Sequence, residues 1–392
     1  MQDVVILSAA RTPIGSFQGA LASLSAPTLG AAALRGAIAR AGIEPGQLEQ
    51  VYMGCVLTAG LGQAPARQAA LGAGCPPSTG AITVNKVCGS GMRAMMSAAN
   101  DLRVGEFTLV AAGGMESMSN APYLAPGARD GLRLGHGKLI DSMLHDGLWD
   151  PYGDKPMGSC AETCVAKYGF TREAQDDFAR ESYRLAREAA ERASRDEIVP
   201  VEVGGKKGNT TVDRDEEPFR ADLEKMGRLK PAFQPEGGTV TAANASSIND
   251  GAAALVLTTA DHATRLGKRP IARLLAQASF AQEPEWFTTA PINAMQKALD
   301  KAGRSIADVD LFEVNEAFAA VAMAAMQDLA IPREKLNVRG GAVALGHPIG
   351  ASGARIVVTL LAALVERGGR LGCAGICLGG GEATAVVLER IE

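Results

Sequence analysis

One cysteine in the first third of the chain has neighbours that favour a reactive thiol. Val84–Gly91 reads VNKVCGSG and places Cys88 at the end of a short, mostly apolar run, Ala81–Val87, and before a helix-like run, Met92–Leu102. The first turn of a helix offers unpaired backbone N–H groups and the positive end of the helix dipole, and both favour an anion. We therefore expect this position to lower the pKa of the Cys88 thiol and to favour thiolate. The alternative is a small buried cysteine at a tight strand-to-helix turn, because free cysteine is commonly buried.

Three further residues that could do chemistry lie in the last third of the chain. Each lies in a glycine-rich loop or at the end of an apolar strand. His347 lies in GGAVALGHPIGASG, which spans Gly340–Gly353 and precedes a helix-like run. Cys377 begins CLGGG after the apolar run Cys373–Ile376, and Asn315 follows an apolar strand in EVNEAFA. Each has a simpler interpretation: a loop histidine bonded to backbone, a buried thiol, and a helix N-cap, respectively.

Taken together, the two cysteines, the histidine and the asparagine match the needs of thiol acyl transfer. One thiolate attacks, a base helps to generate it, a second group moves a proton, and N–H donors hold an oxyanion. Forming a C–C bond through a carbanion next to a carbonyl is the harder step, because the enolate must be stabilised. The spacing therefore predicts a pocket in which distant parts of the chain meet.

Composition limits the classes of protein to consider. The chain has 392 residues, of which 47% are hydrophobic and 21% charged, with a formal net charge of −4. This is a globular composition. It lacks the strong positive charge that would attract nucleic acid. The apolar run Ile356–Val365 is about half the length of a membrane span. The chain starts directly with a strand-like run, so we expect neither a membrane partner nor a leader, and a cytoplasmic location.

The seven cysteines argue against both a disulfide framework and a metal site. Their number is odd, and they are spread over a large chain without other signs of secretion. Cys160 and Cys164, like Cys373 and Cys377, are four positions apart with no histidine nearby, which does not match a structural zinc site. No GxxxxGK[ST] or complete GxGxxG segment is present. We expect no metal and no nucleotide cofactor.

Alternating strand-like and helix-like runs predict an α/β fold with helices on both faces of the sheet. Around residue 119 the pattern gives way to frequent proline and glycine, then to a charged helix over Arg172–Arg195, and apolar strand character returns at Ala252–Thr258. We predict a first half formed by residues 1–118 and 248–270. An inserted loop domain is expected over 119–247, and a second half over 271–392.

The second half repeats the first. Ala41-Gly42, followed by Leu48 and Val51, corresponds to Ala302-Gly303, followed by Val309 and Phe312, 261 positions later. Ser90-Gly91 before one helix corresponds to Ser352-Gly353 before another, 262 positions later. Long-period similarity of this kind indicates two copies of one fold. Two such halves placed face to face would form one pocket with residues from both.

At this point the chain resembles the thiolases, in particular the acetyl-CoA acetyltransferase branch. The motifs that carry the resemblance run in family order over essentially the whole chain: VNKVCGSGMRA (84–94), GGMESMSNAPY (113–123), MGSCAE (157–162), GTVTAANAS (238–246), NDGAAA (249–254), EVNEAFA (313–319), GGAVALGHPIGASGAR (340–355) and CLGGG (377–381). The resemblance implies an α/β thiolase-like fold, in which two repeated halves form a five-layer αβαβα core. The inserted loop domain would bind coenzyme A.

The resemblance also implies a role for each candidate residue. Cys88 is similar to the nucleophile that accepts the acyl group, and His347 to the histidine that deprotonates it and contacts the thioester oxygen. Cys377 is similar to the second cysteine, which acts as acid and base. Asn315 would hold a water that forms one oxyanion hole with His347, and the backbone N–H groups of Cys88 and Gly379 would form a second.

For substrate binding, the resemblance points to Ser246 as a contact of the pantetheine part of CoA and to Arg220 as a residue near the adenine. It implies acyl-CoA and CoA as partners, fatty acid metabolism as context, and a homotetramer built as a dimer of dimers. Pro156 stands where several family members have a histidine that lines the acyl pocket. Glu216-Glu217 is followed by Pro218-Phe219, without the tyrosine of potassium-dependent relatives, so no bound cation is expected.

The expected reaction is the Claisen condensation of two acetyl-CoA molecules to acetoacetyl-CoA and CoA, with thiolysis of 3-ketoacyl-CoA as its reverse. A degradative 3-ketoacyl-CoA thiolase with broader chain-length tolerance is the alternative. A ketoacyl-synthase-like enzyme is disfavoured by Cys377, because those enzymes typically use histidines there. A non-catalytic CoA carrier on the same fold is disfavoured by the intact set of Cys88, His347, Cys377 and Asn315.

Overall fold

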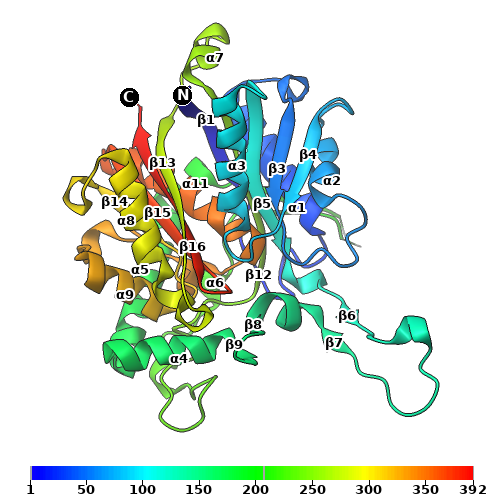
Figure 1. Cartoon of the computed structure of the whole chain (residues 1–392), viewed down its shortest axis with the longest axis vertical. Helices are drawn as coiled ribbons and strands as arrows, with labels where there is room; N and C mark the ends of the chain where they lie inside the picture. Colours follow the sequence, from blue (N-terminus) through cyan, green and yellow to red (C-terminus); the bar gives the residue numbers. More distant parts are fainter. Residues whose placement is uncertain (1, 206–207, 392) are drawn as a thin grey trace.

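The computed structural model describes residues 2–205 and 208–391. Its centre is a ten-stranded mixed sheet with the strand order β14-β15-β16-β13-β1-β12-β5-β3-β4, to which the short β2 adds beside β12 (Figure 1). The sheet strands are β1 Val4–Arg11, β2 Gly15–Ser16, β3 Gln50–Gly54, β4 Gly80–Val84, β5 Leu109–Ser117, β12 Asn249–Thr259, β13 Ala272–Ala281, β14 Leu311–Val314, β15 Leu371–Leu378 and β16 Glu382–Arg390.

Helices cover this sheet and pass between its two parts. Those of the first half are α1 Ala26–Ala41, α2 Pro65–Gly72 and α3 Ser90–Val104, and the short α7, Ala260–Arg265, follows β12. Those of the second half are α8 Ala290–Ala302, α9 Ala319–Leu329, α10 Ala342–Leu345 and α11 Ile349–Arg367. Single turns of 3-10 helix occur at Pro45–Gln47, Met118–Asn120, Ala128–Asp130, Met226–Arg228, Pro284–Thr289, Ile306–Asp308 and Arg333–Lys335.

The predicted repeat is present in the order of these elements. The sequence α1, 3-10 turn, β3 of the first half recurs as α8, 3-10 turn, β14 in the second. Both helices end at a glycine in the left-handed region, Gly42 with φ 62° and Gly303 with φ 64°. A side chain other than glycine is strained in that conformation, so the Ala-Gly pair is a helix stop that both copies share.

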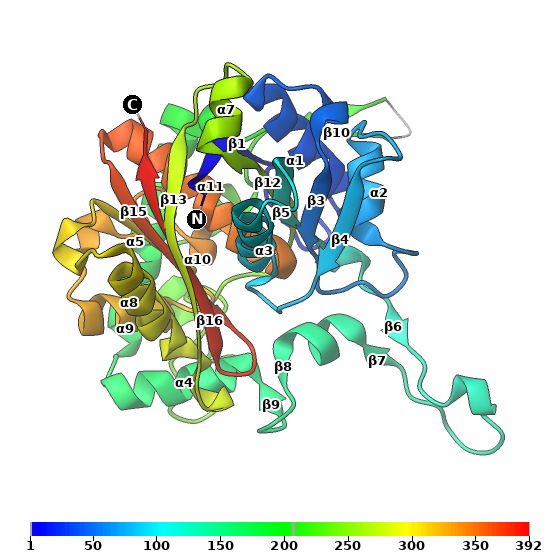
Figure 2. The same ribbon diagram turned by 45° about the horizontal axis from the view of Figure 1, so that its top comes forward.

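The hydrophobic core is divided as the predicted αβαβα layering requires. One cluster lies between α1, α2 and the outer face of the first part of the sheet, and another between α8, α9 and the outer face of the second part. A third surrounds α3 and α11 and takes residues from both parts of the sheet, including Ile6, Val110, Ile376 and Val386. Figure 2 shows α3 and α11 between the two parts. The five-layer core is confirmed.

Glycines allow the two central helices to start against each other. A Cβ atom at Gly353 in α11 would lie 2.6 Å from the backbone nitrogen of Met92 in α3. A Cβ at Gly91 in α3 would lie 2.8 Å from the nitrogen of Ala354. Such distances are below contact, so only glycine permits this approach. The loops that carry Cys88 and His347 directly precede these two helix starts.

The long connection between β5 and β12 lies largely outside the sheet. It contains α4 Met157–Tyr168, α5 Arg172–Glu197 and α6 Glu217–Arg220, a π-helical turn over Met143–Leu148, and the short strand pairs β6 Tyr123–Leu124 with β7 Ile140–Asp141, β8 Trp149–Asp150 with β9 Lys155–Pro156, and β10 Val201–Val203 with β11 Thr210–Val212. The segment that includes β6 and β7 projects from the body as an arm (Figures 1 and 2).

The helix α11 is long and apolar enough, by length and composition, to cross a membrane. However, 83% of its most apolar window is buried inside the protein. Buried Arg355 near its start also fits a helix enclosed by protein, where a charge can be paired. In this fold α11 is the central core helix.

Candidate active site

Cys88 lies in a tight turn between β4 and α3. The strand β4 ends at Val84, three residues before the predicted end of this strand, because Val87 adopts φ 45° and turns the chain. A positive φ is a rare and strained conformation for a β-branched residue. Ser90 holds the turn, since its hydroxyl donates to the carbonyl of Val87 at 2.6 Å and accepts from the N–H of Lys86 at 2.8 Å. The turn therefore fixes where Cys88 points.

The thiol of Cys88 favours its protonated form, contrary to the expectation from sequence, although the residue is only partly buried. Burial raises its pKa to about 12, although the backbone N–H groups of Gly379 and of Cys88 itself bond to the sulfur and oppose that shift. The prediction of a lowered pKa was wrong because the loss of solvation outweighs the N–H groups at the helix start. Formation of the thiolate therefore needs a base.

Cys377 lies at the end of β15 and faces the same space. It is 1% exposed. Burial is the main cause, and the neighbouring Cys88 the second, of a thiol pKa well above the ordinary value. The two segments touch closely, because a Cβ at Gly89 would lie 2.1 Å from Leu378. The structure thus brings Cys88, Cys377 and the N–H of Gly379 together from the two halves of the chain.

His347 is held between α10 and α11 by contacts on both sides. Its backbone N–H donates to Oδ1 of Asn249 at 2.9 Å, and its Nδ1 lies 2.6 Å from the hydroxyl of Ser352. Its Nε2 is buried and has no partner among the described residues. Burial, and secondarily the charge of Arg355, lower the pKa of His347 to about 3, so the imidazole is neutral near pH 7.

Asn315 sits at the carboxyl end of β14, next to the strand that carries Cys377. Its backbone N–H donates to the carbonyl of Gly375 at 3.0 Å. The residue is not a helix N-cap, since α9 begins at Ala319 with Phe318 as its cap. Its side-chain Oδ1 accepts from Arg355 at 3.3 Å, while Nδ2 is buried without a partner in the described part of the chain. An unpaired buried donor of this kind is common where water or substrate binds.

Glu116, at the end of β5, ties the histidine segment to the loop after β3. Its carboxylate accepts the backbone N–H groups of Val56 at 3.0 Å, Leu57 at 3.1 Å and Gly350 at 2.8 Å. Burial raises the pKa of Glu116 to about 7, and these N–H groups oppose the shift. Its contact with Gly350 places the start of α11 against β5.

The predicted CoA residues lie in the long connection, beside a surface cavity of about 560 Å³. Arg220, at the end of α6, lines this cavity together with Lys225, Ser247 and Tyr183. Ser246 is half-buried, and its hydroxyl donates to the carbonyl of Ala317 at 2.9 Å. Ser246 is therefore tied to the segment that follows Asn315, and the next residue, Ser247, lines the cavity.

Pro156 caps the start of α4 close to the cysteine site. The next residue, Met157, is 3.8 Å from the position that a Cβ of Gly379 would occupy, and Val87 is 3.5 Å from it. Pro156 itself is half-buried and pairs through β9 with Trp149 of β8. This segment is thus near enough to Gly379 to shape the space around an acyl group.

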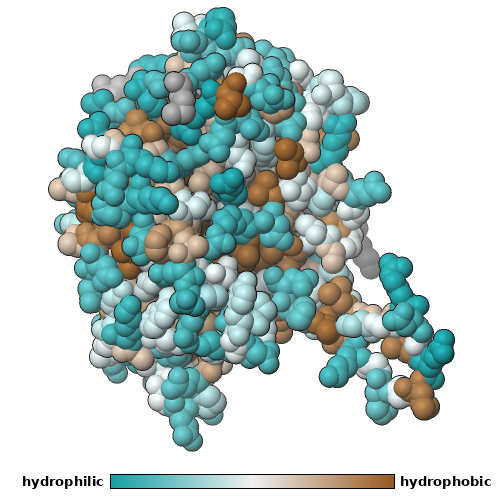
Figure 3. All heavy atoms as spheres, in the orientation of Figure 1, coloured by the Kyte–Doolittle hydropathy of each residue, from teal (hydrophilic) through white to brown (hydrophobic). Residues whose placement is uncertain are grey.

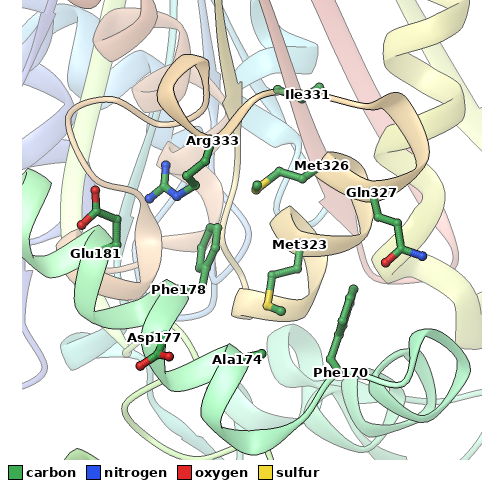
Figure 4. Close-up of a pocket in the computed structure, with 10 residues that line it drawn as sticks. All are labelled: Phe170, Ala174, Asp177, Phe178, Glu181, Met323, Met326, Gln327, Ile331 and Arg333. Carbon is green, nitrogen blue, oxygen red and sulfur yellow. The ribbon is translucent and has the colours of Figure 1, made fainter.

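A second cavity, of about 480 Å³, lies away from these residues, between α5 and α9 (Figure 4). Its walls combine apolar side chains with the charged Asp177 and Glu181, and Arg333 stacks over the ring of Phe178 at 4.8 Å. It contains none of the residues predicted to act in catalysis or CoA binding. This cavity is therefore separate from the residues gathered around Cys88.

The geometry combines the thiols of Cys88 and Cys377, the neutral imidazole of His347, and the backbone N–H groups of Cys88 and Gly379. These are the parts of a thiol-dependent acyltransferase that works through a thioester. The family model described as the N-terminal domain of thiolase matches residues 4–261, and the one described as its C-terminal domain matches residues 268–390. The chain belongs to the thiolase family.

Individual relatives are similar over the full length. The chain is 53% identical over 391 residues to acetyl-CoA acetyltransferase 2 of Arabidopsis thaliana. The aligned region covers 99% of this chain and 97% of the relative. It is 50% identical over 393 residues to acetyl-CoA acetyltransferase of Pseudomonas aeruginosa, with full coverage of both. The crystal structure of Acat5 thiolase from Ascaris suum in complex with coenzyme A superposes with a TM-score of 0.94 at 45% identity, again over the whole of both chains.

Sequence reasoning did not identify Ser352, Arg355 or Glu116 as parts of the site. Arg355 and Ser352 lie inside the motif that carries His347, and Arg355 immediately precedes an apolar helical run. Glu116 ends the otherwise apolar strand β5. For Arg355 and Glu116, the signal in the sequence was a charged residue within or at the end of an apolar element. Such a charge needs a partner when it is buried.

Proposed function

We infer that this protein is a thiolase of the acetyl-CoA acetyltransferase type. It catalyses the condensation of two acetyl-CoA molecules to acetoacetyl-CoA and CoA, and the reverse thiolysis. Full-length similarity to enzymes of that name supports this activity. The observation that carries it in the structure is the meeting of Cys88, Cys377 and the Gly379 N–H from the two halves of the chain.

In the proposed first step, Cys88 becomes acetylated. Its sulfur attacks the thioester carbon of acetyl-CoA as its proton passes to Nε2 of His347. The C–S bond to CoA breaks, and the CoA sulfur takes the proton of Cys377 as it leaves, so that Cys377 becomes a thiolate while His347 keeps the proton from Cys88. The N–H groups of Cys88 and Gly379 lie at the sulfur and would hold the acyl oxygen. The exchange of one thioester for another costs little overall.

In the second step, a new C–C bond forms. The thiolate of Cys377 removes a proton from the methyl group of a second acetyl-CoA, and the enolate oxygen is held by Nε2–H of His347 and by a water on the Asn315 amide. The carbanion attacks the acetyl carbon on Cys88, and the C–S bond to Cys88 breaks. Acetoacetyl-CoA leaves, and Cys88 regains its proton from Nε2 of His347. We propose that these steps need no metal or prosthetic group and that CoA enters only as substrate.

Acetylation of Cys88 is the step to test. Wild-type protein incubated with radiolabelled acetyl-CoA should retain label on the peptide that contains Cys88, and Cys88→Ser should retain none. Cys377→Ser is the control, because it should still be acetylated while failing to form acetoacetyl-CoA. Label on a different residue, or absence of thiolysis of acetoacetyl-CoA by the wild type, would overturn the assignment.

The degradative alternative differs in the length of acyl chain that the site accepts. Pro156 favours this alternative, because it replaces the histidine that several relatives have at this position. It precedes Met157, which lies close to Gly379. The rate of thiolysis should be measured from four-carbon to long-chain 3-ketoacyl-CoA. A steep fall beyond four carbons fits the condensing enzyme, whereas similar rates at all lengths would establish the alternative.

We propose that CoA enters along the cavity of Arg220 and that Ser246 contacts its pantetheine part. The cationic groups of Arg220 and Lys225 at the cavity support this path, as does the hydrogen bond of Ser246 to Ala317, two residues after Asn315. Arg220→Ala should raise KM for acetyl-CoA several-fold and leave kcat unchanged, because a contact remote from the reacting atoms gives uniform binding. An unchanged KM would exclude this role.

We further propose a homotetramer in the cytoplasm, with a part in fatty acid metabolism. The arm exposes the side chains of Tyr123, Leu132, Leu134 and Leu139 (Figure 3), and such exposed apolar groups favour association. The seven free thiols suit a reducing compartment. Light scattering should give four copies for the wild type and a smaller assembly for Leu132→Glu/Leu134→Glu.

We propose that the chain divides at residues 118 and 248 and near residue 270, with the connection between them as the CoA-binding loop domain. The pairing of β12 between β1 and β5 supports this division, since it returns the chain to the first part of the sheet. Limited proteolysis should cut first within residues 119–247.

A further inference from the structure

We propose that Arg355 is a positioning residue that fixes the orientation of the Asn315 side-chain amide. In that orientation the NH2 group of Asn315 can donate a hydrogen bond toward the reacting atoms. The inference rests on the proposed role of Asn315 in holding the enolate. It assigns to a residue of α11 the task of choosing which end of that amide faces the chemistry.

The contact itself is buried and specific. Nη2 of Arg355 donates to Oδ1 of Asn315 at 3.3 Å, and the two residues are 2% and 0% exposed. The partners come from different elements, 40 positions apart: Asn315 from the end of β14 and Arg355 from the second turn of α11. Nδ2 of the same amide has no partner in residues 2–205 and 208–391.

The chemistry of the two groups decides the orientation. A guanidinium has only N–H donors, whereas an amide has an oxygen acceptor at one end and an NH2 donor at the other. Turning the Asn315 amide by half a turn would set donor against donor between two buried side chains. Arg355 therefore requires Oδ1 on its own side, and Nδ2 must point away from it. An oxyanion needs a donor, so this is the orientation that catalysis can use.

Arg355 is in turn held by Glu313, two residues before Asn315. Its Nη1 lies 3.4 Å from Oε2 of Glu313, which is 1% exposed. The remaining charged groups that act on Arg355 are Arg11, Glu197 and Glu316, all of them buried. The guanidinium thus has little freedom to leave the amide. Its charge also reaches His347, the other proposed contact of the enolate oxygen.

The experiment is a double-mutant cycle on condensation. Arg355→Met removes the donor with little change in length. We expect kcat for acetoacetyl-CoA formation to fall about 10²-fold, towards the loss expected for Asn315→Ala. KM for acetyl-CoA should change less than threefold, and acetylation of Cys88 should persist. The double variant Arg355→Met/Asn315→Ala should be no slower than Asn315→Ala alone, because Arg355 acts through that amide.

Arg355→Lys keeps a cationic donor and should recover part of kcat. If Arg355→Met does not fold, as judged by circular dichroism, the same cycle is run with Arg355→Lys, whose smaller loss should likewise vanish in the Asn315→Ala background. Losses that multiply in the double variant, or a wild-type kcat for Arg355→Met, overturn the proposal. If Asn315→Ala alone condenses at the wild-type rate, the failure lies instead with the proposed role of Asn315.

Discussion

At the scale of single residues, Ser352 gives His347 two usable states. The Ser352 hydroxyl lies 2.6 Å from Nδ1 of His347 and 3.0 Å from the carbonyl oxygen of Pro348. If the hydroxyl donates to Pro348, it accepts from Nδ1–H, and Nε2 is a base. If it donates to Nδ1, then Nε2 carries the hydrogen and is a donor. One rotating hydroxyl thus serves a histidine that must first accept a proton and later hold an oxyanion.

Removal of this hydroxyl should slow the activation of Cys88. Ser352→Ala leaves Nδ1 unpaired when the imidazolium forms, and a hydrogen bond to a charged group contributes about 1.5–3 kcal/mol, or roughly ten- to hundredfold in rate. Alkylation of Cys88 by iodoacetamide at neutral pH should slow by that factor, and Ser352→Thr should restore most of it. An unchanged alkylation rate in Ser352→Ala would show that Ser352 has no part in proton transfer.

Glu313 should make the stability of the protein depend on pH. Burial raises the pKa of its carboxyl to about 8, an effect that Arg355 opposes. Between the pKa of the unfolded chain, about 4.5, and that value, the folded state holds a proton that the unfolded state has lost. Stability from this group is therefore present at low pH and falls as pH rises through the window, by up to about 1.4 kcal/mol per pH unit.

Urea unfolding between pH 5 and pH 8 checks this expectation. Glu313→Gln carries no proton to lose and keeps the shape of the side chain, so its free energy of unfolding should fall less steeply with pH than that of the wild type. Equal slopes in the two proteins would mean that Glu313 is ionised throughout the range.

At the scale of elements, the close approach of α3 and α11 should be sensitive to a single methyl group. In Gly353→Ala the new Cβ would meet the backbone of Met92 at 2.6 Å, and backbone has little room to yield. We expect a loss of about 1–3 kcal/mol in stability, together with a lower kcat, because the loops that carry Cys88 and His347 lead directly into these two helices. Gly46→Ala is the control, since its Cβ would find only Pro76, at 4.0 Å. Equal urea midpoints for the two variants would refute the packing argument.

The secondary structure was predictable wherever local signals were strong. The helix expected over Arg172–Arg195 is α5, Arg172–Glu197, and the helix-like run Met92–Leu102 lies within α3, Ser90–Val104. Periodicity and capping signals are local, and they survive folding. The strand expected over Ala81–Val87 stops at Val84. The chain turns at Val87, which has φ 45°, and the apolar pattern of the sequence does not reveal this turn.

The site was predictable only as a set of motifs. Cys88, Cys377, His347 and Asn315 each lie in a recognisable segment, but Arg355 acts on Asn315 across 40 positions, and Glu116 on Gly350 across 234. Such contacts exist only once β14, β5 and α11 are packed. The same holds for the pKa of Cys88, because the local helix start predicts a lowered value and burial by the second half of the chain raises it.

At the scale of the whole molecule, the two repeated halves share one core. The strand β1 of the first half pairs with β13 of the second at Val5–Arg273 and Ile6–Ala272. The cluster around α3 and α11 takes residues from both halves, so neither half can bury its inner helix alone. A fragment of residues 268–392 would expose α11, whose apolar window is 83% buried in the full chain. Burial of apolar surface is the main stabilising contribution to folding, and this fragment loses much of it.

We therefore expect the halves to be inseparable in folding although they are repeats in sequence. The fragment 268–392 expressed alone should show no cooperative thermal transition and should bind a hydrophobic dye. A matched cut in the folded protein, made by a protease site inserted after Gly267, leaves the shared core intact, so the two pieces should elute together from a sizing column and keep thiolysis activity. A cooperative melt of the isolated fragment would show that the inner layer is not needed for its fold, and separation of the cut halves would show that the shared core does not hold them.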